Sequence, residues 1–326
     1  MLLHGPNGAG KTNLLEALHV GTQGFSPRAR RDAQLIRFGA DAGRIALGGT
    51  LGKASFETDV VLARHESRRV ELNGERLSSA ERLRHELTTL VFTPDRLAVV
   101  KGAPATRRAY LDRTVGRLLP ARATLANDYA AAVGQRNAGL RRVRAGASTR
   151  DALSPWSARV VSVGNDLVQA RAEAVELLAP LFEGIADELG LDSATLGYEG
   201  EQSTASELEA RFEHDLERGI TGLGPHLHDL RIEAGSRDLR AFGSQGEQRV
   251  AVLALVLAEA DALRSRVGTS PLVLLDDVLS ELDGDRRAAL ATMLSRNAQT
   301  VVTATVTAAL PREPAQALSV TPGKVR

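Results

Sequence analysis

The feature that most constrains this chain is an octapeptide near its start, Gly5-Pro6-Asn7-Gly8-Ala9-Gly10-Lys11-Thr12, which fits the pattern G-x-x-x-x-G-K-[ST]. The apolar stretch Leu2-Leu3 precedes it and a helical pattern of apolar residues over 14–18 follows it, so a strand, a loop and a helix are expected in this order. Glycines allow the backbone to curl until successive N–H groups face one anion, and the following helix adds the positive end of its dipole. We therefore expect these eight residues to bind the phosphates of a nucleotide.

Two residues of the octapeptide have specific expected roles. Lys11 would reach the β and γ phosphates of ATP, and Thr12 would offer its hydroxyl to Mg²⁺. Only four of the 41 basic residues are lysines, and lysine at position 11 suits a narrow site that a guanidinium would fit poorly. The alternative is a glycine-rich turn that caps a helix, and the complete motif in its strand, loop and helix context argues against it. ATP and Mg²⁺ are the expected cofactors.

A second segment supplies the carboxylates that such a site needs. Residues 271–275 are a continuous apolar run that ends in Asp276-Asp277, as expected of a buried parallel strand with acidic residues at its carboxyl end. We expect Asp276 to hold Mg²⁺ through water opposite Thr12, and Asp277 to orient or deprotonate the attacking water. The alternative for this segment alone is a strand followed by an Asx turn.

A third segment, Ser244-Gln245-Gly246-Glu247, opens the apolar helical pattern of residues 250–263. Ser244 with Glu247 three residues later also predicts a capping box, and this structural role is compatible with a functional one. The segment resembles the signature of ABC-type ATPases in its SMC-like form, S-x-G-E. The resemblance implies that Ser244, Gly246 and Glu247 contact ATP held by a second copy of the chain, with Ser244 acting in trans, and that a homodimer forms on ATP binding.

One further segment supports this resemblance, and two other features depart from it. Ser280-Glu281-Leu282-Asp283 resembles the D-loop, which crosses the dimer interface in such ATPases. Most ABC-type ATPases have glutamate where this chain has Asp277, and the chain has no histidine after His228 to act as the switch residue. The resemblance then leaves Thr303 or Thr305 for that position. We expect ATP binding with weak hydrolysis that serves as a conformational switch.

Longer stretches narrow the resemblance to the RecF family. They are Thr12–Ala17, Val91–Leu97, Val100–Pro104, Arg107–Asp112, Gly224–His226 with Asp229-Leu230, and Leu274–Asp283. The resemblance implies an ATP-dependent DNA-binding protein of recombinational repair and replication, which acts at single-strand gaps and ssDNA–dsDNA junctions and in the SOS response. It implies single-stranded and gapped duplex DNA, RecR and RecO as partners.

The chain departs from the family pattern at three places, and at one of them Pro27 replaces the usual central histidine in Ser26-Pro27-Arg28. Leu227 and His228 interrupt the family's Gly-Pro-His-Arg-Asp-Asp motif, so only His226 and Asp229 carry over. RecF proteins also have about two antiparallel strands ahead of the phosphate loop, whereas four residues precede it here. We expect these strands to be missing from the sequence because of a truncated or misassigned start.

The fold class implied is α/β: an ABC-ATPase head (P-loop NTPase) of the SMC type with an inserted helical lobe. Residues 1–110 and 225–326 would form a discontinuous ATPase lobe, and residues 111–224 a mainly helical lobe, since Ala, Arg and Leu recur there with helical periodicity. Within the ATPase lobe, residues 56–62 and 69–72 are predicted strands, and Asn73-Gly74 predicts a tight hairpin turn. A final loop and strand are expected after Leu310.

Composition adds few constraints. The chain has no cysteine, and no apolar run approaches the roughly 20 residues that span a bilayer, so we expect a soluble, cytoplasmic protein without a membrane partner. The net charge of +1 leaves DNA binding open, because phosphates are bound by clustered basic residues. Two such clusters are candidates for DNA contacts or, alternatively, solvated faces. They are Arg136, Arg141, Arg142 and Arg144, and Arg28, Arg30 and Arg31.

Two other functions fit parts of the sequence. One is the ATPase subunit of an ABC transporter, against which stand the S-x-G-E signature and Pro94, near the place of the transport-type glutamine loop. The other is a nucleotide-gated binding protein with negligible hydrolysis, which Asp277 and the missing switch histidine favour.

Overall fold

The chain is described by a computed structural model that covers residues 1–29, 31–268, 270–296 and 299–326, with the side chains of Asp95, Glu281, Ser295, Arg296 and Ala308 left aside. It divides into two units. The first comprises Met1–Leu97, Glu188–Gly190 and Leu263–Arg326, and the second comprises Ala98–Asp187 and Leu191–Ala262. These units differ from the predicted lobes at residues 98–110 and 225–262, which belong to the second unit, and at residues 188–190, which belong to the first. The division into an ATPase lobe and a helical lobe with these boundaries therefore remains a prediction.

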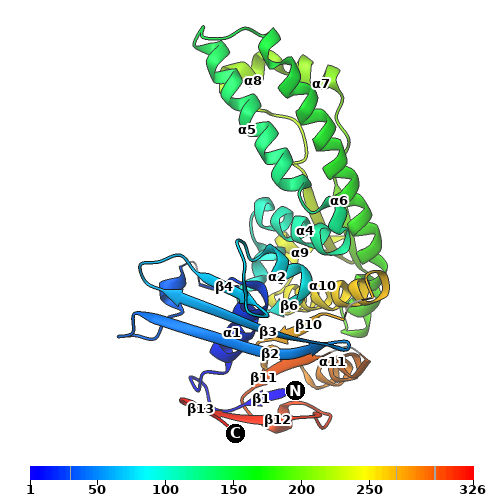
Figure 1. Cartoon of the computed structure of the whole chain (residues 1–326). Helices are drawn as coiled ribbons and strands as arrows, with labels where there is room; N and C mark the ends of the chain where they lie inside the picture. Colours follow the sequence, from blue (N-terminus) through cyan, green and yellow to red (C-terminus); the bar gives the residue numbers. More distant parts are fainter. Residues whose placement is uncertain (30, 269, 297–298) are drawn as a thin grey trace. The chain divides into compact units, whose positions relative to one another are not determined.

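A six-stranded sheet forms the centre of the first unit, in the order β13-β12-β1-β11-β10-β6 (Figure 1). Its strands are β1 (Leu2–His4), β6 (Thr89–Phe92), β10 (Leu272–Leu275), β11 (Thr300–Ala304), β12 (Ala317–Thr321) and β13 (Lys324–Val325). All neighbours are parallel except β13, which pairs with β12 in antiparallel fashion. The strands predicted before the phosphate loop, before Asp276 and after Leu310 are thus confirmed.

A second, antiparallel sheet of the first unit has the order β2-β3-β4-β5. Its strands are β2 (Ala42–Leu51), β3 (Ala54–Ala63), β4 (Arg69–Leu72) and β5 (Glu75–Arg76). The predicted turn is confirmed, since Asn73 and Gly74 both have positive φ, 52° and 79°. The sequence did not predict β2, because its three glycines hide a ten-residue strand that pairs along its whole length with β3.

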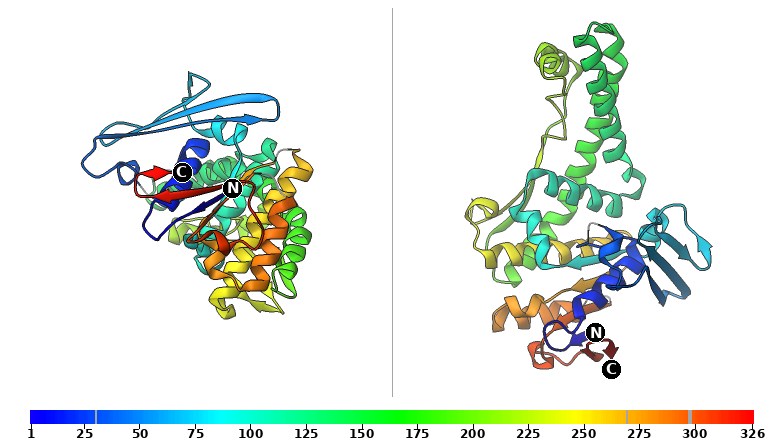
Figure 2. Two further views of the ribbon diagram at one scale, coloured as in Figure 1. Left: turned by 90° about the horizontal axis from the view of Figure 1, so that it is seen from below. Right: turned by 90° about the vertical axis from the view of Figure 1, so that its left-hand side faces the viewer.

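Helix α1 (Lys11–Gln23) packs against both of these sheets. Leu15 lies in a core with residues of the parallel strands, and Val20 lies in a second core with residues of β3 and β4. Gly21 permits close contact with β2, since a Cβ there would lie 2.2 Å from Cδ1 of Leu47. The helices α2 (Glu81–Glu86) and α11 (Gly284–Arg296) complete this unit (Figure 2).

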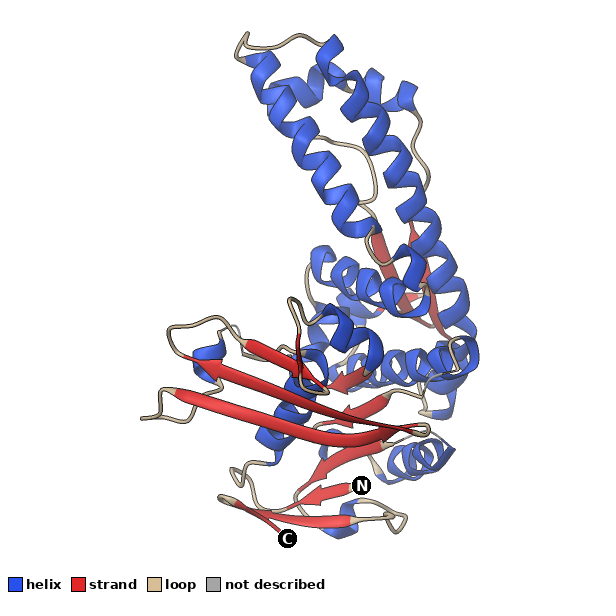
Figure 3. Cartoon of the chain, in the orientation of Figure 1, coloured by secondary structure: helices blue, strands red, loops and turns tan. Residues whose placement is uncertain are grey.

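The second unit is mainly helical and contains a small antiparallel sheet (Figure 3). Its helices are α3 (Ala98–Lys101), α4 (Pro104–Leu118), α5 (Leu125–Arg144), α6 (Ser154–Glu188), α7 (Ala205–Ala210), α8 (Phe212–Arg218), α9 (Leu239–Phe242) and α10 (Gln245–Arg266), of which the last turn of α10 belongs to the first unit. Its strands are β7 (Ala194–Glu199), β8 (Asp229–Ala234) and β9 (Arg237–Asp238). The helical periodicity seen over 111–189 is confirmed, as is the apolar helix after the signature.

One hydrophobic cluster packs the long helices α5 and α6 of this unit against each other. Tyr129 and Ala132 of α5 pack against Val160 and Leu167 of α6, and Leu208 of α7 joins them.

Short 3-10 turns connect the elements of both units, at Asp32–Gln34, Pro94–Leu97, Pro120–Arg122, Asp151–Leu153, Val278–Glu281 and Thr307–Ala309. Within the described part of the chain, no helix combines the length and apolar character needed to cross a membrane.

Candidate functional site

The predicted phosphate loop connects β1 to α1 and depends on glycine at two positions. Gly10 has a φ of 102°, in the left-handed region that glycine adopts without steric cost. Gly5 approaches the backbone of β12 so closely that a Cβ there would lie 2.1 Å from the carbonyl oxygen of Val320. The chain therefore forms this loop only because these positions lack side chains.

Lys11 and Thr12 begin α1 and point their polar atoms to the loop and to β10. The buried ammonium of Lys11 donates to the carbonyl oxygens of Gly5 and Pro6, at 2.7 and 3.0 Å. The hydroxyl of Thr12 donates to Oδ1 of Asp276 at 3.1 Å. Residues 264 positions apart thus meet as the sequence predicted, because β1 and β10 both flank β11 and end at the same edge of the sheet.

A cavity of about 310 Å³ opens at this edge. It is lined by Asn7, Gly8, Gly10, Lys11, Thr12, Asn13, Arg28, Asp276, Asp277 and Thr303. Five of the eight predicted loop residues and both predicted carboxylates therefore share one cavity within the first unit. Gly5, Pro6 and Ala9 belong to the loop without lining the cavity.

Arg28, which the sequence offered as a candidate for DNA contacts or a solvated face, lines this cavity. The hydroxyl of Ser26 accepts the backbone N–H groups of Arg28 and Ala29, at 3.0 and 2.7 Å, and donates to Glu16 of α1. This turn directs the segment after α1 back to the phosphate loop. No signal within the local sequence separates an arginine at a nucleotide cavity from one at DNA. Of the same cluster, Arg30 lies outside the described residues.

The two consecutive carboxylates differ in backbone conformation. Asp276 continues β10 and donates its N–H to the carbonyl of Phe92 on β6, at 3.0 Å. Asp277 has a φ of 51° and a ψ of 26°, in the left-handed region, and turns the chain away from the sheet. Oδ1 of Asp276 accepts from Thr12 and also from Thr303, whose hydroxyl lies 2.9 Å away. The only proton of the Thr303 hydroxyl is thus donated to Asp276, which leaves none for a phosphate oxygen.

The predicted D-loop follows directly. The hydroxyl of Ser280 donates to the carbonyl of Asp277 at 2.9 Å, and Oδ1 of Asp283 accepts the N–H of Arg286 at the start of α11, also at 2.9 Å. The side chain of Glu281 lies outside the described ones. Ser280 therefore stabilises the turn that leaves β10, and Asp283 stabilises the first turn of α11.

The signature segment lies in the second unit, where Ser244 and Glu247 form the predicted capping box. Oγ of Ser244 accepts the N–H of Glu247 at 3.2 Å, and Glu247 accepts the N–H of Ser244 at 2.7 Å. Hydrogen bonds from the N–H and the side chain of Ser244 lower the pKa of the Glu247 carboxyl below its ordinary value, and the charge of Arg237 at 3.2 Å adds to the effect. The hydroxyl of the exposed Ser244 thus contacts Glu247 within the capping box.

The turn before the signature is held by buried contacts. Gln248 donates from Nε2 to the carbonyls of Leu239 and Gly243, at 2.8 and 3.1 Å. A Cβ at Gly243 would lie 2.5 Å from the carbonyl oxygen of Leu239, so glycine is required there. Gly246 lies in the first turn of α10 with nothing closer to its missing Cβ than Oγ of Ser244, at 4.0 Å. The start of α10 is therefore open on this face.

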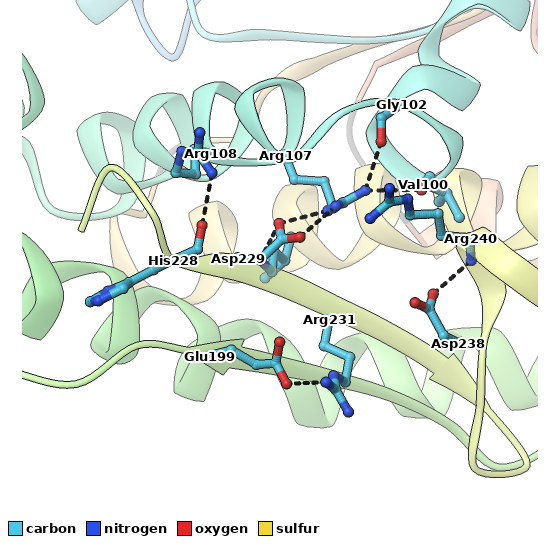
Figure 4. A network of polar contacts seen from close by, with 11 residues as sticks. Val100, Gly102, Arg107, Arg108, Glu199, His228, Asp229, Arg231, Asp238 and Arg240 are labelled. Atoms are coloured by element: carbon cyan, nitrogen blue, oxygen red, sulfur yellow. Dashed lines mark hydrogen bonds and ion pairs between the residues drawn. The ribbon is translucent and has the colours of Figure 1, made fainter. Parts of the chain in front are cut away.

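Two segments that carried the family resemblance meet in the second unit (Figure 4). Arg107 of α4 forms a bidentate ion pair with Asp229 of β8, with 2.7 Å between Nε and Oδ1. Nη1 of Arg107 also donates to the carbonyls of Val100 and Gly102, and Arg108 donates to the carbonyl of His228 at 2.9 Å. These contacts hold α4 against β8 and the residue that precedes it.

His226, which belongs to the family motif of residues 224–229, has a structural role. Its Nε2 lies 2.9 Å from the carbonyl of Thr221, which can only accept, so Nε2 carries the proton and Nδ1 accepts from the Tyr129 hydroxyl at 2.7 Å. Burial lowers the pKa of His226 below its ordinary value. Arg171 holds the same loop through the carbonyl of Pro225, at 2.7 Å, while it pairs with Asp112.

The predicted DNA cluster on the helical segment is wrong for Arg136. Its side chain is 1% exposed and donates to Asp215, which is 0% exposed, at 2.7 Å. Arg144 donates to the carbonyl of Glu217 at 2.8 Å, and Arg141 donates to that of Gly219 at 3.5 Å. These carbonyls end α8, so the cluster serves helix packing and capping, because basic groups are favoured at helix C-termini. Arg142 is exposed.

The cavity of the first unit offers a hydroxyl and a carboxylate to a divalent cation. The hydroxyl of Thr12 donates its hydrogen bond to Oδ1 of Asp276, so the lone pairs of the Thr12 oxygen remain free to bind a cation. Within the described residues, no group of three or more His, Asp or Glu side chains could hold a metal ion by itself. This donor set fits Mg²⁺, which keeps several waters and uses few protein ligands beside phosphates.

Comparison with known proteins agrees with this geometry. The RecF/RecN/SMC N terminal domain family matches residues 1–322. The DNA replication and repair protein RecF of Anaeromyxobacter sp. (strain K) is 38% identical over 93% of this chain and 86% of its own length. The same protein of Heliobacterium modesticaldum is 34% identical over 92% and 85%.

Solved structures share the fold. A structure of the recombination mediator protein RecF with ATP, in the RecFOR pathway, matches all of this chain and 90% of its own with a TM-score of 0.86 at 24% identity. The Smc head domain of Pyrococcus furiosus matches with a TM-score of 0.58. The predicted fold class, an α/β ABC-ATPase head of the SMC type, is confirmed, and the chain belongs to the RecF family.

Proposed function

We propose that this chain is an ATP-binding protein of DNA replication and recombinational repair, which uses ATP to close a homodimer on DNA. The observation that carries the proposal is the 3.1 Å contact between Thr12 and Asp276 beside Lys11, in one cavity of the first unit. The curated relatives bear the name DNA replication and repair protein RecF, and a RecF structure of the same fold contains ATP. Localisation in the cytoplasm is part of the proposal.

The residues of the cavity would divide the work on the nucleotide. The backbone N–H groups of residues 7, 8 and 10–12 would surround the phosphates, and Lys11 would exchange its two carbonyl contacts for phosphate oxygens. Thr12 and Asp276 would hold Mg²⁺, which supplies neutralisation of phosphate charge when bound. Asp277, which is half-buried in the same cavity, would orient the attacking water or accept its proton.

The signature segment would complete the site in trans. Ser244 is exposed at the start of a 22-residue helix, and its hydroxyl would exchange its contact with Glu247 for a phosphate oxygen. A γ-phosphate held by the phosphate loop of one copy would accept this donor from the other copy, with Gly246 allowing close approach and Glu247 holding the turn. Dimerisation would then depend on ATP, because the phosphate joins the two halves.

DNA would be held mainly through its backbone, since aromatic residues make up only 3% of the chain. The expected targets are single-stranded and gapped duplex DNA at ssDNA–dsDNA junctions, with RecR and RecO as protein partners and a role in the SOS response. The pathway named in the titles of the structural relatives, RecFOR, supports these partners.

A second candidate, a nucleotide-gated binding protein with negligible hydrolysis, rests on Asp277. Aspartate is one methylene shorter than the glutamate that most ABC-type ATPases place there, so its carboxylate reaches less far from the turn after β10. This candidate shares ATP binding and dimerisation with the first and differs in turnover. Family membership supports both above an ABC transporter subunit.

Size measurement with light scattering, with and without ATP, Mg²⁺ and gapped DNA, tests the proposal. The wild type is expected to dimerise only with ATP and Mg²⁺ and to retain gapped DNA in that state. Lys11→Ala should remain monomeric because it loses nucleotide affinity, whereas Ser244→Arg should bind ATP and remain monomeric. A wild type that stays monomeric and free of DNA under all conditions would refute the proposal, and ATP turnover separates the two candidates.

A further inference from the structure

One buried hydroxyl contacts both of the consecutive acidic residues of the cavity. Oγ1 of Thr303 lies 2.9 Å from Oδ1 of Asp276 and 2.8 Å from the backbone nitrogen of Asp277. Thr303 is 0% exposed, and β11 places it beside β10. The paired positions Leu275 and Val302 are the last of the ladder between these strands, so the next residues, Asp276 and Thr303, lie side by side.

The direction of the two hydrogen bonds is determined by chemistry. The amide of Asp277 can only donate, so Thr303 accepts from it, and the single hydroxyl proton is then donated to the carboxylate of Asp276. A valine at this position would have nearly the same shape and could make neither bond. Serine could make both.

The amide of Asp277 belongs to an unusual backbone conformation. With a φ of 51°, Asp277 is one of four non-glycine residues with positive φ in the described part of the chain. Such conformations persist where surrounding contacts hold them, and they concentrate at functional sites. The contact with Thr303 is such a restraint, because it ties the N–H of the left-handed residue to a side chain anchored in a central strand.

We propose that Thr303 is a positioning residue for hydrolysis, which through one hydroxyl orients the carboxylate of Asp276 and holds Asp277 in its left-handed turn. This inference rests on the proposed ATPase function of the cavity. It gives Thr303 a role different from that of a phosphate sensor, since its donor is directed to Asp276. A shift of the Asp276 carboxylate would act on the Asp277 turn through this hydroxyl.

Amide hydrogen exchange tests the contact without any nucleotide. In Thr303→Val, the amide of Asp277 should exchange about tenfold faster than in the wild type, because it loses its only acceptor among the described residues. Thr303→Ser should restore the protection. Thr89→Val is the matched control, since Thr89 is a buried threonine of β6 in the same sheet that donates to Thr22 at 2.8 Å, outside the residues that line the cavity. It should leave the exchange of Asp277 unchanged.

Nucleotide assays test the consequence for hydrolysis. With Thr303→Val, kcat for ATP should fall on the order of a hundredfold, as expected when a reacting group is misplaced, while the Kd of a fluorescent ATP analogue with Mg²⁺ changes by less than about threefold. Thr303→Ser should keep most of the turnover. A general loss of folding would instead lower binding and turnover together, and Thr89→Val reports how much of it comes from a lost buried hydroxyl.

The outcomes separate the two proposals. An Asp277 amide that exchanges equally fast in wild type and Thr303→Val overturns the inference, whatever the nucleotide assays give. Faster exchange with unchanged kcat overturns the role in hydrolysis. A wild type that binds no ATP refutes the proposed function, while the exchange experiment still decides whether Thr303 holds Asp277.

Discussion

The guanidinium of Arg107 and the carboxylate of Asp229 form a bidentate ion pair, with 2.7 Å between Nε and Oδ1, although 122 positions separate them in the chain. The Arg107 side chain is 4% exposed, and its remaining donors contact the carbonyls of Val100 and Gly102. The pair lowers the pKa of Asp229 although burial alone raises it. Two stretches typical of the family thus meet within the second unit, where they stabilise the junction of α4 and β8.

Removal of Arg107 should therefore destabilise the second unit. Arg107→Ala leaves Asp229 and two carbonyls without their partner, and we expect the free energy of unfolding in urea to fall by about 2–4 kcal/mol. Arg231→Ala is the control, since Arg231 pairs with Glu199 and both side chains are half exposed. It should cost less than about 1 kcal/mol. Equal losses in the two variants would contradict a structural role for the Arg107 pair.

Arg136 should likewise act on stability. Arg136→Ala leaves Asp215 buried without a counter-ion, so we expect a loss of about 3–5 kcal/mol in the free energy of unfolding. The double variant Arg136→Met with Asp215→Leu should recover much of it, because no charge then remains buried. Denaturation of both variants provides the measurement. If Arg136→Ala is as stable as the wild type, the buried ion pair between Arg136 and Asp215 has no structural role.

The two roles of Ser244 can be separated by a matched pair of variants. Ser244→Ala and Thr204→Ala each remove the cap of a capping box in the second unit, and each should cost about 1 kcal/mol of stability. Only Ser244→Ala should also weaken ATP-dependent dimerisation, because it alone removes the donor proposed to reach a phosphate in trans. Light scattering with ATP and Mg²⁺ measures this effect. If both variants dimerise like the wild type, Ser244 is a helix cap alone.

Acidification should destabilise the second unit through His226. Burial lowers the pKa of this imidazole below its ordinary 6.5, so the unfolded chain binds the proton more strongly. Its stabilising contribution is present above pH 6.5 and is lost as the pH falls through the lower pKa of the folded state. The free energy of unfolding should fall over this range, and less steeply in His226→Gln. An identical pH dependence in the variant would exclude His226, leaving His228, whose pKa burial also lowers.

The sequence predicted the elements whose causes are local. The phosphate loop, the hairpin turn at Asn73-Gly74 and the capping box of Ser244 each depend on interactions within a few residues, so their patterns are visible in one dimension. The apolar run before Asp276 predicted a buried strand for the same reason. By contrast β2 was missed, because its glycines carry no strand signal and its ten pairs with β3 determine it.

The roles of individual charged and polar side chains required the tertiary structure. In sequence Arg136 and Arg28 both belong to basic clusters, yet one is buried against Asp215 and the other lines the nucleotide cavity. Thr303 was a candidate for the switch residue, but the sequence did not indicate its hydrogen bonds to the carboxylate of Asp276 and the amide of Asp277. The sequence by itself determined the family, the phosphate loop and the succession of strand, loop and helix around it, because glycine spacing and apolar periodicity act locally. Which hydroxyl, arginine or carboxylate meets which partner was decided by strand order and burial, because these bring together residues that are far apart in the chain, such as Arg136 and Asp215, 79 positions apart.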